Sequence, residues 1–98
     1  MKIKRKPTMP YSLFPLGNLY STRGINESLD RQEMFAMVAR HACGDWGICC
    51  QEDKLANQQA LKTGARLLSV YRSKSGDKIW IITEADRSAT TVLYPSEY

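Results

Sequence analysis

The sequence lacks several features that would identify a function directly. It contains a single histidine and only three cysteines, and two of these cysteines are adjacent. No apolar run approaches the roughly 20 residues that a membrane-spanning helix needs, and no secretory signal follows the basic start. These absences predict a cytoplasmic protein without a disulfide framework. Any proton transfer by an imidazole must use His41.

The size and charge of the chain indicate one small globular domain. It has 98 residues, of which 43% are hydrophobic and 24% are charged, and its formal net charge is +4. The excess charge comes from four residues: Lys2, Lys4, Arg5 and Lys6. We expect residues 1–10 to form a flexible basic arm and residues 11–98 to form a single domain of balanced charge. The arm is either a solvated tail or a nucleic-acid contact, and Met9 is an alternative start that would remove it.

Two segments carry the signals of helices. The first begins at Asn26, a good N-cap residue, and continues with apolar residues at helical spacing to a glycine stop at Gly44. The second runs from about Gln51 to Thr63, with acidic residues in its first turn and Gly64 after its last. Its apolar stripe is thin, which predicts a surface helix.

Four further segments predict strands. Residues 13–22 are interrupted by a proline and a glycine, which limits them to a short edge strand or an extended segment. Residues 66–72, 78–83 and 89–94 are joined by short polar loops, as in a meander. Residues 78–83 place apolar side chains on both faces, so each face needs at least partial cover. The predicted fold is therefore α+β, with two helices packed on a small, mostly antiparallel sheet that ends in a three-stranded meander.

Five possible zinc ligands lie within ten residues: His41, Cys43, Asp45, Cys49 and Cys50. Structural zinc sites use pairs of closely spaced ligands, and this segment has no C-x-x-C pair. We therefore expect three reduced thiols, no metal and no other cofactor.

A small metal-independent ribonuclease is one hypothesis for the function. In it, His41 would transfer the proton, Arg87 would stabilise charge on the phosphate, and Tyr71 would complete the site. Nothing in their spacing brings these three residues together. The alternative is structural: His41 would bond a carbonyl or Asp45 at the helix end, and Arg87 would pair with a neighbouring carboxylate.

Two segments are candidates for binding a partner. Asp45 and Trp46 lie just after the first helix, where the tryptophan is either an exposed anchor or a plug over one face of the sheet. Glu84, Asp86 and Arg87 lie in the loop before the last strand, where the arginine could bind a phosphate or carboxylate. The alternative for this loop is an Asx turn that serves only the connection.

Several motifs together resemble a known family. They are HACGDWG at 41–47, Asn57, RLLSVY at 66–71 and TEADRSATTVLYPSEY at 83–98. These motifs are similar to those of the short "plasmid-related" proteins of bacterial plasmids, integrative elements and phages, some of which carry the label of a restriction-modification subunit. The resemblance covers residues 13–98 and does not include the basic arm.

This resemblance implies a mobile-element accessory protein that acts by binding. Such a protein could be an inhibitor of a host nuclease complex, of anti-CRISPR or anti-restriction type. The expected partner is a host protein or nucleoprotein complex, and no membrane is involved. A ribonuclease-like enzyme and a nucleic-acid-binding module are the alternatives.

Overall fold

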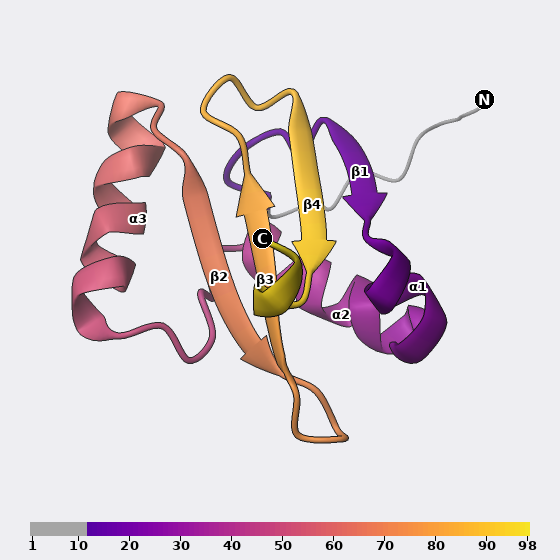
Figure 1. Ribbon diagram of the computed structural model, residues 1–98. Helices are drawn as coiled ribbons and strands as arrows, with labels where there is room; N and C mark the ends of the chain where they lie inside the picture. Colours follow the sequence, from indigo (N-terminus) through magenta and orange to yellow (C-terminus); the bar gives the residue numbers. More distant parts are fainter. Residues whose placement is uncertain (1–11) are drawn as a thin grey trace.

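The computed structural model describes residues 12–98, which form three α-helices, a four-stranded sheet and one 3-10 turn (Figure 1). In chain order the elements are β1 (Asn18–Ser21), α1 (Arg23–Ser28), α2 (Arg31–Ala42), α3 (Gln51–Thr63), β2 (Leu67–Arg72), β3 (Lys78–Thr83), β4 (Ala89–Leu93) and η1 (Pro95–Glu97). The α+β class is confirmed, and α3 and β3 have the predicted bounds. The predicted arm at residues 1–10 lies outside the described residues.

The sheet has the strand order β1-β4-β3-β2. The three C-terminal strands pair antiparallel, as predicted for a meander. β1 is an edge strand, and it pairs parallel with β4, with Asn18 opposite Ala89 and Ser21 opposite Val92. The sheet is therefore mixed, although most of its pairs are antiparallel.

The prediction of a single helix from Asn26 to Gly44 is wrong at its start. The chain forms the short α1, leaves helical geometry at Leu29, and begins α2 with Asp30 as the N-cap. The Asp30 carboxylate accepts a hydrogen bond of 3.0 Å from the backbone N–H of Glu33, which satisfies one of the free donors at the helix start. The predicted stop is confirmed, because Gly44 has a φ of 84° just after the end of α2.

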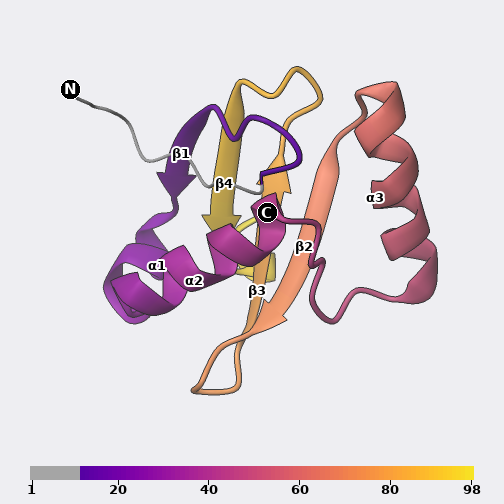
Figure 2. The ribbon, with the colours of Figure 1, turned by 180° about the vertical axis from the view of Figure 1, so that it is seen from behind.

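The main core lies between the sheet and the helices α1 and α2, which cover one of its faces (Figure 2). Ile25 from α1 packs with Met37 and Val38 from α2 against Ile79 and Ile81 of β3, and all five are buried. Burial of these apolar side chains stabilises the packing of α1 and α2 on the sheet.

A second cluster joins α3 to the outer edge of the sheet. Ala60 of α3 packs with Leu67 of β2, Trp46, Phe14 and Cys49. Both ribbon views place α3 alongside β2 rather than across a face of the sheet (Figures 1 and 2). The predicted packing of helices on the sheet is confirmed, and α3, whose apolar stripe is thin, packs along the edge strand β2.

The other face of the sheet has little cover, and we call it the open face. By strand register its central side chains are Leu68 and Val70 of β2, Trp80 and Ile82 of β3, and Thr91 and Leu93 of β4. Among residues 12–98, η1 and Tyr98 lie over this face, in front of β3 and β4 (Figure 1). Ile82 and Leu93 are buried there, each with 4% of its surface exposed. Within residues 12–98, no helix is both long and apolar enough to span a membrane.

Candidate functional site

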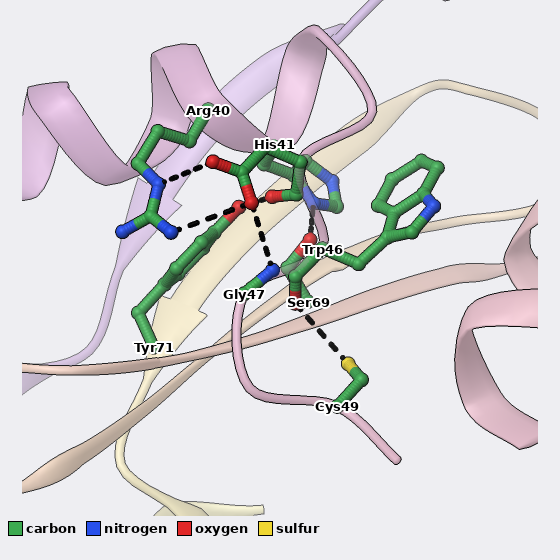
Figure 3. A network of polar contacts seen from close by, with 8 residues as sticks. Arg40, His41, Trp46, Gly47, Cys49, Ser69 and Tyr71 are labelled. Atoms are coloured by element: carbon green, nitrogen blue, oxygen red, sulfur yellow. Dashed lines mark hydrogen bonds and ion pairs between the residues drawn. The ribbon is translucent and has the colours of Figure 1, made fainter. Parts of the chain in front are cut away.

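His41 lies in the last turn of α2, with its ring fully buried against the sheet (Figure 3). Its Nδ1 is 2.5 Å from Ser69 Oγ, and its Nε2 is 2.8 Å from Thr83 Oγ1. Thr83 Oγ1 is 2.7 Å from Thr90 Oγ1, and Thr90 donates a hydrogen bond to the carbonyl of Leu16. These side chains form one continuous chain of hydrogen bonds that joins α2 to β2, β3 and β4.

Each hydroxyl in this series of hydrogen bonds has one proton to donate, and this fixes the direction of every bond in the series. Thr90 uses its hydroxyl proton on the Leu16 carbonyl, so the proton between the two threonines must come from Thr83. Thr83 therefore accepts from Nε2–H of His41, and Nδ1 accepts from the Ser69 hydroxyl. Neutral His41 thus satisfies both of its ring nitrogens inside the protein.

The electrostatics of the site favour the same neutral form. Burial, and to a lesser extent the positive charge of Arg87, lower the pKa of His41 from 6.5 to about 4. Near neutral pH the imidazole is therefore uncharged and fully engaged. His41 holds the sheet and α2 together, and no face of its ring is accessible to a substrate.

The prediction that His41 bonds a carbonyl or Asp45 is wrong, because Asp45 has other partners. Its carboxylate accepts from Arg40 Nε at 2.7 Å and from the backbone N–H of Gly47 at 3.2 Å (Figure 3). The hydrogen bond with Arg40 lowers the pKa of Asp45 and raises that of Arg40. The Tyr71 hydroxyl donates to the backbone carbonyl of Asp45 at 2.5 Å, and burial raises the pKa of Tyr71.

The residues after Asp45 complete the outer edge of β2. Ile48 donates to the Val70 carbonyl at 2.7 Å, and Val70 donates to the Trp46 carbonyl at 3.1 Å. Gly47 allows this approach because it has a φ of 77°, and a side chain there would collide with the Val70 carbonyl. Two residues earlier on the same edge, the Asn57 side chain of α3 donates to the Leu68 carbonyl and accepts from the Leu68 N–H. The outward backbone groups of Leu68 and Val70 at this edge are thereby occupied.

Trp46 is buried, with 4% of its surface exposed, and it stacks against Phe14 at a ring distance of 6.4 Å. Its side chain therefore fills the second core and does not form an exposed anchor for a partner. The indole Nε1 is the one buried side-chain nitrogen or oxygen in residues 12–98 that has no hydrogen-bond partner.

The Arg87 side chain bonds to backbone groups of the fold. It has a φ of 61°, and its guanidinium donates to the carbonyl of Ala60 at 3.0 Å and to that of Ala65 at 2.6 Å. It thus links the end of α3 to the loop before β4. The prediction that Arg87 pairs with a neighbouring carboxylate is wrong, because these backbone carbonyls take its donors. Asp86 instead accepts from the Ser88 N–H at 3.0 Å, and hydrogen bonding by Ser88 lowers its pKa.

The three residues of the ribonuclease hypothesis do not meet at one accessible pocket. The Phe14 ring packs against two of them, with its centre 5.2 Å from the centre of the His41 ring and 5.7 Å from the Arg87 guanidinium carbon. The Tyr71 hydroxyl is bonded to the Asp45 backbone. Of the proposed binding residues, Glu84 and Asp86 are exposed in the loop, and Asp45 is exposed beside Arg40.

The cysteines show no sign of shared chemistry. All three are free thiols; Cys43 and Cys50 are exposed and Cys49 is buried. Burial raises the pKa of Cys49, whose thiol donates to the Trp46 carbonyl. In the part of the chain that the structure describes, no three His, Cys, Asp or Glu side chains gather closely enough to hold a metal ion.

Comparisons with protein-family models, with curated proteins and with solved structures gave no match for this chain. The function must therefore be inferred from the residues themselves. Sequence reasoning missed the hydroxyl partners of His41, although Ser69, Thr83 and Thr90 carry a detectable signal: each is a polar residue at an inward-facing position of a strand.

Proposed function

We propose that this protein acts by binding, as a cytoplasmic accessory protein of a mobile genetic element that inhibits a host nuclease complex of CRISPR or restriction type. The observation that supports a binding role is the full burial of His41, whose two ring nitrogens are bonded to Ser69 and Thr83. A general acid or base must reach the proton that it transfers, and this imidazole cannot.

The remaining polar groups that resemble catalytic residues are similarly engaged. The donors of Arg87 go to backbone carbonyls, and the Tyr71 hydroxyl goes to another. These motifs therefore support the fold, and recognition is left to exposed surfaces. The counter-defence role comes from the resemblance to plasmid-related proteins, whose motifs include this same network.

A plating assay tests the proposal. Cells that each carry one nuclease-based defence system are infected with a phage that the system targets, with and without the protein. We expect plating to rise by at least about tenfold against one system, and a tagged copy to co-purify with components of that system.

The Tyr71→Phe variant separates binding from catalysis. It removes only a hydroxyl that donates to the Asp45 backbone, so protection should equal that of the wild type when circular dichroism shows an intact fold. RNA cleavage by the purified protein that this substitution abolishes would overturn the proposal in favour of the ribonuclease.

A further inference from the structure

The open face of the sheet combines aromatic and basic side chains. Trp80 of β3 is half-buried there, and its ring lies 5.6 Å from the ring of Tyr98 at an angle of 65°. Tyr98 is 69% exposed, and Tyr20 of β1, which is 53% exposed, follows the same face because it pairs with Thr91. The aromatic side chains of this face thus come from β1, β3 and the segment after η1, and of these Tyr20 and Tyr98 are exposed and Trp80 is half-buried.

Basic side chains lie at both ends of this aromatic group. Arg66 holds its guanidinium carbon 5.6 Å from the centre of the Tyr98 ring. At the other end Arg72 of β2 is opposite Lys78 of β3, and both are exposed. One Arg72 nitrogen donates to the Gly76 carbonyl at 2.7 Å, and the exposed guanidinium has further N–H donors for a phosphate. From the rise of a strand, residues 66 and 72 are about 20 Å apart along β2.

Few carboxylates oppose these cations. Glu84 follows β3, and its N–H donates to the Ala89 carbonyl, which extends the pairing of β3 with β4 by one residue. The alternation of β3 therefore places Glu84 on the open face, opposite Arg66. The carboxylate of Glu97 is bonded to the Thr22 hydroxyl and the Gly24 N–H, so it is directed toward α1. Among residues 12–98, the open face consequently carries the three cations Arg66, Arg72 and Lys78 and the carboxylate of Glu84.

We infer that the open face binds single-stranded nucleic acid. Unpaired bases stack on exposed aromatic rings of a sheet, and arginine and lysine side chains beside them contact the phosphates. A duplex hides its bases from such a surface, which makes the single strand the favoured ligand. This inference rests on the proposed binding function. It implies that the protein contacts an exposed segment of single-stranded nucleic acid in the host complex.

Fluorescence anisotropy of the full chain tests the inference. The probes are labelled RNA and DNA single strands of about 12 nucleotides and the corresponding duplex. We expect either single strand to bind more tightly than the duplex, and the RNA and DNA arms identify which nucleic acid is preferred. Stacking should also quench the fluorescence of Trp80, whereas the buried Trp46 gives a constant background.

Substitutions on the open face should weaken binding in two separable ways. Tyr98→Ala should reduce affinity about 5- to 150-fold through the loss of one stacked base. Arg72→Gln with Lys78→Gln should lower the slope of log affinity against log salt by about 1.4, because each phosphate contact contributes about 0.7. The matched control removes two exposed cations elsewhere, Arg31→Gln with Lys62→Gln, and should change neither quantity.

Several results would overturn the inference. These are equal binding of duplex and single strands, equal losses in the control variant, or binding that disappears when residues 1–6 are deleted. Capture of a nuclease-treated host protein that depends on Tyr98 would assign the open face to a protein partner instead. Because these assays use purified protein, their failure leaves the plating assay intact, and protection without nucleic-acid binding would reject this inference alone.

Discussion

Lowering the pH from about 7 to about 5 should destabilise the fold through His41 alone. The chain has one histidine, and unperturbed carboxylates titrate near pH 4, below this window. The hydrogen-bond chain from Ser69 to Leu16 accommodates the neutral imidazole. A change of stability in this window therefore reports on the buried network.

The sign and size of the effect follow from the pKa of His41, which is lowered from 6.5 in the unfolded chain to about 4 in the fold. Below pH 6.5 the unfolded chain binds a proton, whereas the folded protein stays neutral until about pH 4. The fold therefore has its full stability above about pH 6.5, and the part that depends on neutral His41 is lost progressively as the pH falls from 6.5 toward about 4. The free energy of unfolding should decrease by about 2 kcal/mol between about pH 7 and about pH 5.

Urea unfolding at the two pH values, followed by circular dichroism, measures this difference, and NMR of the single imidazole measures its titration directly. A free energy of unfolding that stays constant within about 0.5 kcal/mol would contradict the network. So would an imidazole that titrates near 6.5, its value without burial.

Three further predictions concern the same fold. Thr83→Val should cost about 1–3 kcal/mol of unfolding free energy because it leaves Nε2 of His41 without a partner, whereas Thr91→Val on the open face should change it by less than about 0.5 kcal/mol; equal effects in denaturant melts would contradict the network. Ile81→Ala should cost about 2–5 kcal/mol in the same melts, and a loss under about 1 kcal/mol would show that β3 is not central. Deleting residues 1–6 should leave the circular dichroism spectrum unchanged and should reduce the salt dependence of nucleic-acid binding without abolishing the binding of single strands; a changed spectrum would give the arm a structural role.

The sequence predicted elements with strong local signals. α3 has acidic residues in its first turn and Gly64 in the left-handed conformation at its end, and β3 is rich in β-branched residues, with Trp80 among them. The start of α2 was missed although Asp30 and Glu33 have the spacing of a helix cap, because Asn26 offered an earlier cap in the same apolar pattern.

The candidate site was less predictable because its contacts are long-range. His41 is 28 residues from Ser69 and 42 from Thr83, and no local spacing indicates such pairs. Arg87 likewise contacts Ala60, 27 residues away, in preference to the carboxylates beside it. Local patterns specify helices and strands, whereas these partners are brought together only when α2 and α3 pack with the sheet.

The central claim is that the buried network supports the fold and the open face performs the function. Plating of a targeted phage on cells that express the wild type, Tyr71→Phe or the double variant Arg72→Gln with Lys78→Gln tests this claim most directly. The account predicts wild-type protection by Tyr71→Phe and a loss of at least about tenfold in the double variant. Protection that is lost in Tyr71→Phe with its fold intact, and retained in the double variant, would contradict it.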